Sequence, residues 1–248
     1  GLALAERLRE RALGAMEGAE DEQPNWRAYV SRNWSVYKAA PASLRADRDF
    51  LLVVVQEWPE ALRYASDELR NDREVVLEAI KIDATALRHA SEALQGDRGL
   101  ALEAVRSSWR ALEHLGESLR ADRELVREAV RQDWTAFLQA ASSLRADPQL
   151  ALEAVKQEGL ALQHLAQELR ADRPLVLQAV ERNGLALRHA SEELRGDREV
   201  VMQAVKQNGL ALDHASQELR SSRQVVQRAV AQNGLALRAA APALRAER

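Results

Sequence analysis

Five histidines are the side chains of this chain best suited to bind a metal ion or pass a proton, and they recur at a regular interval. They are His89, His114, His164, His189 and His214. If each interval of 25 residues is one structural unit, equivalent atoms of successive units lie about 8 to 10 Å apart. A zinc ligand, by contrast, lies about 2 Å from its metal. A zinc site or a proton relay is therefore disfavoured, and we interpret the histidines as surface residues of a repeat.

Carboxylates recur in the same way, each with a basic residue three positions later. The acids are Glu78, Glu103, Glu128 and Glu153, and the bases are Lys81, Arg106, Arg131 and Lys156. Such pairs are typical of the surface of a helix. Acid/base catalysis needs groups with different pKa values, and a repeated environment gives every copy the same one. The chain also has no cysteine. We therefore predict no catalytic residues, no cofactor and no metal site, and we expect that the chain is not an enzyme.

These residues belong to a repeat that runs through most of the chain without insertion or deletion. Its boundary is marked by a Leu-Arg-Ala-Asp tetrad or a close variant, which begins at Leu44, Leu69, Leu94, Leu119, Leu144, Leu169 and Leu194. A fixed period in this range is typical of stacked repeats, in which each unit needs its neighbours to bury its apolar face. The sequence therefore predicts an all-α fold, an α-solenoid of stacked two-helix repeats of 25 residues.

Within a repeat, local signals predict where each helix begins and ends. Asp172 is a typical N-cap, and Pro174 is tolerated only in the first turn. The apolar face expected for the first helix is Leu175, Val176, Ala179 and Val180, which Leu177 would widen. Asn183-Gly184 predicts that the first helix ends with a residue in the left-handed backbone conformation. The second helix is expected over 185–194, burying Ala186, Leu187, Ala190 and Leu194.

Three segments follow from this frame. Residues 1–21 predict an N-terminal capping helix and an acidic link, 22–46 fit the repeat weakly as a degenerate first unit, and 47–246 contain eight full repeats, expected as one continuous solenoid. The last repeat has no polar cap, so we expect its apolar face to be covered by a partner or by further sequence. Because residue 1 is not Met, a processed or partial chain is expected.

Net charge and hydropathy limit the classes of molecule that the chain is expected to bind. The 248 residues carry a formal net charge of -3, which provides no bulk attraction to nucleic acid or to an anionic membrane. The most apolar run, 50–55, is far shorter than the roughly 18 residues of a membrane span. We expect a soluble or peripheral protein that binds neither nucleic acid nor the membrane interior.

Aromatic residues distinguish the two halves of the chain. All ten precede residue 138. Trp34, Trp109 and Trp134 share the column between the two predicted helices, and Trp58 lies one position earlier. Exposed tryptophans are favoured anchors at protein interfaces, so these four are the candidate protein-binding residues. The alternative is that each indole folds back over its own repeat.

The repeat resembles a known family. The pattern at 197–219, Asp-Arg-Glu-Val-Val-x-x-Ala-Val-Lys-Gln-Asn-Gly-x-Ala-Leu-x-x-Ala-Ser-x-Glu-Leu, is similar to the repeat of the domain-of-unknown-function family DUF4116, and the similarity extends over about 47–246. The resemblance implies an all-helical repeat and no assigned activity. Departures lie in the first half, where Pro59, Ala84, Trp109 and Trp134 replace the turn glycine.

Two functions remain. The favoured one is a non-catalytic scaffold or accessory subunit that binds other proteins. Because such repeats are abundant in protists, dinoflagellates especially, and occur in some bacterial effectors, an organellar assembly such as a photosynthetic or respiratory complex is one setting for it. The alternative is a helical-repeat RNA-binding protein, which should vary one or two columns to read bases and should present a basic groove.

Overall fold

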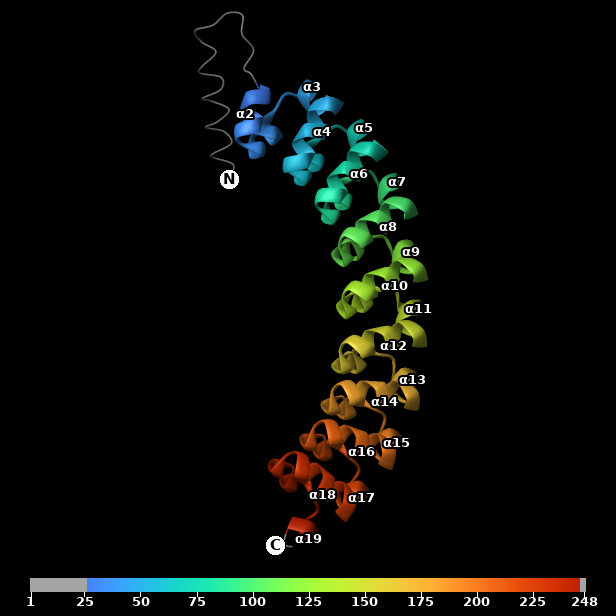
Figure 1. Cartoon of the computed structure of the whole chain (residues 1–248). Coiled ribbons are helices and arrows are strands. Elements are labelled where there is room, and N and C mark those ends of the chain that lie inside the picture. Colours follow the sequence, from blue (N-terminus) through green and yellow to red (C-terminus); the bar gives the residue numbers. More distant parts are fainter. Residues whose placement is uncertain (1–25, 246–248) are drawn as a thin grey trace, which may run out of the picture. The chain divides into compact units, whose positions relative to one another are not determined.

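The computed structural model describes residues 26–245, in which every regular element is a helix (Figure 1). The side chains of Arg27, Tyr29, Ser31, Trp34 and Ser35 and the segment predicted as a capping helix, residues 1–21, lie outside this description. The chain divides into two compact units, Gly1–Leu119 and Arg120–Arg248. Over the described range, no helix has the length and apolar character needed to cross a membrane.

Each full repeat contains three helical segments. A ten-residue α-helix comes first and is followed by a six-residue 3-10 helix and a four-residue α-helix. The long helices are α4 (Arg48–Glu57), α6 (Arg73–Ile82), α8 (Arg98–Ser107), α10 (Arg123–Gln132), α12 (Pro148–Gln157), α14 (Arg173–Arg182), α16 (Arg198–Gln207) and α18 (Arg223–Gln232).

The two shorter segments follow each long helix in the same order. The 3-10 helices are η2 (Pro59–Tyr64), η3 (Ala84–His89), η4 (Trp109–His114), η5 (Trp134–Gln139), η6 (Gly159–His164), η7 (Gly184–His189), η8 (Gly209–His214) and η9 (Gly234–Ala239). The short α-helices are α5 (Asp67–Arg70), α7 (Glu92–Gln95), α9 (Glu117–Arg120), α11 (Ser142–Arg145), α13 (Gln167–Arg170), α15 (Glu192–Arg195), α17 (Gln217–Arg220) and α19 (Pro242–Arg245). Residues 26–45 show the same order in α2 (Trp26–Arg32), η1 (Trp34–Ala39) and α3 (Ala42–Arg45).

The long helices begin where the sequence predicts. The Asp172 carboxylate accepts a hydrogen bond from the Leu175 amide, 2.9 Å away, and Pro174 lies in the first turn of α14. The aspartates that start α4, α6, α8, α10, α12 and α16 make the same cap. Ser222, which replaces aspartate before α18, makes no side-chain cap hydrogen bond. The predicted N-cap is therefore confirmed in every repeat that carries the aspartate.

The end of the long helix differs from the prediction of a left-handed turn. Asn183 is extended, with φ −149° and ψ 107°, and its side-chain oxygen accepts a hydrogen bond from the Leu185 amide. Within 26–245 no glycine or other residue has a positive φ. The extended Asn183 leads directly into η7. The prediction that the long helix ends in a left-handed conformation was therefore wrong.

Glycine is required in this turn because a backbone carbonyl of the next repeat lies close to its Cα. A Cβ added to Gly184 would lie 2.4 Å from the backbone oxygen of Ala204 in the next repeat, and one added to Gly209 would lie 2.3 Å from the oxygen of Ala229. Real Cβ atoms do not come so close to a carbonyl oxygen. At Gly234 the same position is open. The glycine therefore permits the next long helix to pack against the turn.

The segment predicted as one second helix, 185–194, is two helices. Ala190 and Ser191 are extended, with ψ of 158° at both, and separate η7 from α15. The Ser191 hydroxyl accepts a hydrogen bond from the Leu194 amide and so caps α15. The Ser191 amide donates to the Arg170 carbonyl of the preceding repeat at 2.9 Å. The break thus frees a backbone amide to link neighbouring repeats.

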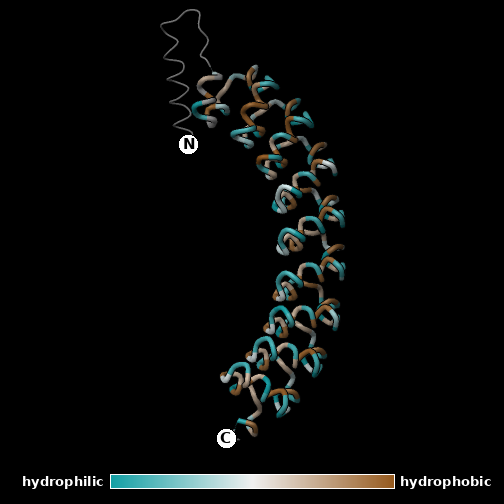
Figure 2. The backbone as a smooth tube through the Cα atoms, viewed as in Figure 1, coloured by the Kyte–Doolittle hydropathy of each residue, from teal (hydrophilic) through white to brown (hydrophobic). Residues whose placement is uncertain are grey.

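The core follows the predicted apolar columns. Val176, Ala179 and Val180 are fully buried, and Leu175 is nearly so. Ala186, Leu187, Ala190 and Leu194 from the two shorter segments are also buried. Apolar and polar stretches alternate along each repeat of the chain in Figure 2. In the second unit, α12, α14, α16 and α18 pack side by side in chain order (Figure 1). The fold is the predicted all-α repeat solenoid, with three helical segments per repeat instead of two.

Candidate protein-binding surfaces

The tryptophans proposed as anchors lie where the long helix ends. Trp58 directly follows α4, while Trp109 and Trp134 begin η4 and η5. All three side chains are half-buried. Trp34 begins η1, but its side chain is outside the described residues. In the backbone, Trp34, Trp109 and Trp134 thus occupy one position of the repeat, and Trp58 lies one position earlier.

Each of these three indoles has a neighbouring side chain within its own unit. The Trp58 ring stacks on Tyr64, with centroids 5.7 Å apart, and the Trp134 ring stacks on His164 of the next repeat at 5.8 Å. The Arg110 guanidinium lies 4.8 Å from the centre of the Trp109 ring. The indoles are thus held in defined orientations while part of each side chain reaches solvent. We use the name tryptophan edge for Trp58 and Trp109 of the first unit together with Trp134 of the second.

The histidine column lies in the 3-10 helices. His89 and His189 each accept a hydrogen bond at Nε2 from the adjacent arginine, at 3.1 Å and 2.7 Å. Burial is the largest cause that lowers the pKa of His89, His189 and His214 below the ordinary value, so these rings are neutral at pH 7. Across the described residues, no three histidine or carboxylate side chains are placed to hold one metal ion.

A second column joins neighbouring repeats by charge. The arginine that begins a long helix reaches the capping aspartate of the next repeat. The Nε–Oδ2 distances are 2.8 Å for Arg48–Asp72 and Arg123–Asp147 and 2.9 Å for Arg173–Asp197. The hydrogen bond from Arg173 is the largest cause that lowers the pKa of Asp197. Pro148 occupies the arginine position in its repeat and cannot form the pair with Asp172. The column supports register and stability.

The outward face of the long helices carries the predicted pairs in the earlier repeats. The nitrogen–oxygen distance is 2.5 Å for Glu78–Lys81, 3.0 Å for Glu103–Arg106 and 3.7 Å for Glu128–Arg131. Glu153 departs from this pattern, because it pairs with Arg127 of the preceding repeat at 2.7 Å. The glutamates of this column in α6, α8, α10 and α12 are therefore each paired with a basic side chain.

The acidic column stops after Glu153. The equivalent residues of α14, α16 and α18 are Gln178, Gln203 and Arg228. Lys206 therefore has no carboxylate one turn before it. Neither Lys206 nor Arg228 forms an ion pair or hydrogen bond with any described residue. The cations of this face in α16 and α18, Lys206 and Arg228, are thus left without an acidic partner among the described residues.

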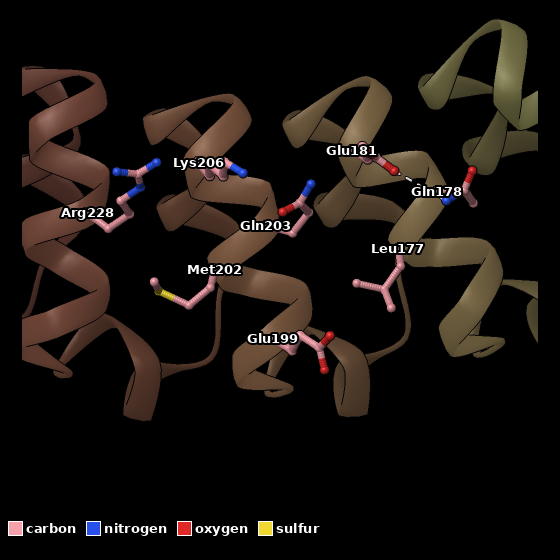
Figure 3. A pocket seen from close by; sticks show the side chains of 8 residues that line it. All are labelled: Leu177, Gln178, Glu181, Glu199, Met202, Gln203, Lys206 and Arg228. Atoms are coloured by element: carbon pink, nitrogen blue, oxygen red, sulfur yellow. Dashed lines mark hydrogen bonds between the residues drawn. The ribbon is translucent and has the colours of Figure 1, made fainter.

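A shallow groove of about 400 Å³ lies on this part of the face. Leu177 of α14 and Met202 of α16 are half-buried and form its apolar part, at the same level of adjacent helices (Figure 3). Gln203, Lys206 and Arg228 line the side toward α18, and Glu181 and Glu199 also contribute. We call this surface the α14–α18 groove.

Sequence reasoning did not find this groove, although its signal was present. Leu177 was expected to extend the buried face of α14, whereas the structure leaves it half-buried at the surface. The change from glutamate to glutamine and arginine along one column is visible in the sequence. Its meaning depends on which columns of successive helices face outward together, which only the packing shows.

Two leucines of the last repeat are exposed. Leu235 and Leu237 are 57% and 36% exposed, whereas Leu212, the equivalent of Leu237 one repeat earlier, is fully buried. Coverage of these leucines by a partner or by further sequence stays a prediction.

Stacked helical segments with nearest-neighbour contacts and regularly repeated surface columns define an all-helical repeat protein. The model of one family, described as "Domain of unknown function (DUF4116)", matches residues 47–95, 97–145, 147–195 and 197–245. The chain belongs to this DUF4116 family, and each match spans two of its repeats. No curated protein and no solved structure matches the chain.

Proposed function

We propose that this chain is a non-catalytic scaffold or accessory subunit that binds another protein through the tryptophan edge. The observation that supports the proposal most is the placement of three half-buried indoles at equivalent turns, each oriented by a neighbouring side chain. An indole already held in place loses little entropy when a partner covers it. A partner gains apolar area at each anchor.

The charges of the chain support a protein partner over RNA. The formal net charge is -3, and the arginines of the repeat boundary that pair with Asp72, Asp147 and Asp197 are neutralised by these carboxylates. A reader of RNA bases needs a continuous basic path for the phosphates. Membership of a larger assembly, including an organellar one, is part of the same proposal and rests on the resemblance alone.

The test begins with the proteins that co-purify with the native chain. The affinity of each identified partner is then measured for wild type and for Trp58→Ala, Trp109→Ala and Trp134→Ala separately. Truncation of an anchor should weaken binding by about 2 kcal/mol or more, which is roughly 30-fold. Thermal unfolding of each variant shows whether the loss is one of binding or of folding.

The matched control is Glu103→Ala, because Glu103 is an exposed residue of a long helix away from the turn. Unchanged affinity in all three tryptophan variants would exclude the edge as the binding surface. Binding of mixed-sequence single-stranded RNA at micromolar concentration, with a steep loss of affinity as salt rises, would replace the scaffold with the RNA-binding alternative.

A further inference from the structure

We propose that the α14–α18 groove binds an extended, acidic segment of a partner protein that carries one large apolar side chain. This surface is separate from the tryptophan edge, because it lies on the outward face of the long helices and not at their ends. The inference goes beyond the proposed function, since it names a second surface and the chemistry of what it binds.

The dimensions of the groove suit an extended chain. Its lining residues come from three successive long helices, from Leu177 on α14 to Arg228 on α18. Neighbouring long helices lie about 8 to 10 Å apart, so the groove runs over roughly 16 to 20 Å. An extended peptide rises about 3.3 Å per residue, and five or six residues cover that length.

The apolar part of the groove provides one anchor position. Leu177 and Met202 lie at the same level of α14 and α16 (Figure 3) and are half-buried, so an apolar side chain placed between them removes further area from water. Methionine adapts its shape to different apolar partners. In α18 the equivalent residue is Gln227, so the apolar part ends where the cations begin.

The charges determine which peptide fits. Of the two acids in the groove, Glu199 is paired with Arg173 at 2.5 Å and Glu181 lies 3.3 Å from the side-chain nitrogen of Gln178. Lys206 and Arg228 have no such partner among the described residues. A carboxylate of the bound segment can meet either cation without displacing an existing pair. The complementary segment therefore carries acidic residues on the α18 side of its apolar anchor.

The test uses fluorescein-labelled peptides of about nine residues and the full chain. One peptide holds a single leucine followed by aspartates and glutamates, a second replaces the acids with lysines, and a third replaces the leucine with serine. Fluorescence anisotropy should show binding of the first peptide only. Because the cations are exposed, its affinity should fall several-fold between about 50 and 300 mM NaCl.

The variants use residues that other repeats already carry at the equivalent positions, so we expect the fold to be preserved. Arg228→Glu restores the glutamate found at this position in α6, α8, α10 and α12, Lys206→Ala copies Ala231, and Met202→Gln copies Gln227. The double change Arg228→Glu with Lys206→Ala should weaken the acidic peptide at least tenfold, and Met202→Gln should weaken it about fivefold. Lys156→Ala, in the same column of α12 but outside the groove, should have no effect.

Three results would overturn the inference. They are equal binding of the acidic and basic peptides, an affinity that Arg228→Glu with Lys206→Ala leaves unchanged, and tighter binding of poly-U RNA than of the acidic peptide at the same residues. The last result would assign the cations to phosphate. Trp134→Ala should leave peptide binding at this groove intact, so failure of the groove and failure of the tryptophan edge are separable.

Discussion

The turn after the long helix is built differently in the earlier and later repeats, and the difference shows two solutions to the same stacking problem. The earlier turns carry Pro59, Ala84, Trp109 or Trp134, whereas the later ones carry glycine. In the later repeats, the carbonyl of the next long helix occupies the space that a Cβ would need. A turn residue with a side chain requires a wider approach at this point. Close contact between repeats and a half-buried aromatic side chain therefore exclude each other at one position.

Two of the glycine turns are also contacted by the last residue of the next long helix. In the later repeats Gln207 accepts a hydrogen bond from the Gly184 amide at 2.6 Å and donates one to the Arg182 carbonyl at 3.4 Å. Gln232 repeats these contacts with Gly209 and Gln207. The equivalent residue of α6 is Ile82, which is 57% exposed. At Gly184 and Gly209 the turn thus presents a backbone amide that a glutamine side chain of the next repeat satisfies, whereas the residue equivalent to these glutamines opposite Gly159 is Arg182.

The largest effect on stability is expected when a methyl group is added to a glycine of the later turns. Gly184→Ala places a Cβ 2.4 Å from a backbone oxygen, and overpacking of this kind costs about 1 to 3 kcal/mol. The matched change Gly234→Ala meets no atom within 4 Å, and the loss of chain entropy in the unfolded state should stabilise it by up to about 1 kcal/mol. Thermal unfolding followed by circular dichroism measures both. Equal melting temperatures for the two variants would show that the approach is not what requires glycine.

A smaller loss of stability is expected when the glutamine that contacts the glycine turn is removed. Gln207→Ala removes two hydrogen bonds to the preceding repeat, so we expect a loss of about 0.5 to 1.5 kcal/mol. Ile82→Ala changes the same column in an earlier repeat and should have little effect, because that side chain is exposed. Hydrogen exchange of the Gly184 amide gives an independent measure. Exchange at the wild-type rate in Gln207→Ala would contradict the contact.

The smallest expected effect is the pH dependence of the stability contributed by the Arg–Asp pairs between repeats. The folded-state pKa of Asp197 is lowered by Arg173, so its pair adds stability above the ordinary aspartate pKa of about 3.9, and this contribution is lost as pH falls through the lowered value. Arg173→Ala should therefore lower the melting temperature at pH 7 and should differ less from wild type near pH 2.

The control for this experiment lies one repeat later. Arg198 hydrogen-bonds Gln224, and the next cap is Ser222 instead of aspartate. Arg198→Ala should change the melting temperature by a similar amount at both pH values. A pH-independent difference for Arg173→Ala as well would remove Asp197 as the titrating group.

Much of the fold was predictable because the signals are local and repeated. The 25-residue period, the Asp172-type cap and the buried columns through Val176 and Leu187 are confirmed. The role of Gly184 was not, because it depends on the Ala204 carbonyl in the next repeat. The break at Ser191 was missed, although serine three residues before Leu194 is a capping signal.

The candidate surfaces were only partly predictable. The tryptophan column could be read from spacing, and the orientation of Trp134 on His164 could not, because the partner lies 30 residues away in another repeat. The α14–α18 groove required the packing of three helices. The protein-binding role of both surfaces stays a prediction.

The amide-to-carbonyl links between repeats have a consequence for how such a chain can evolve. In the second unit, Ser191 donates to Arg170 and Ser216 donates to Arg195, both at 2.9 Å. Because donor and acceptor are backbone atoms at fixed places in the period, duplicating or deleting a whole 25-residue block joins the same two groups again. An insertion of any other size leaves an unmatched junction. Gene length should therefore change in complete blocks, with surface residues free to diverge between the copies.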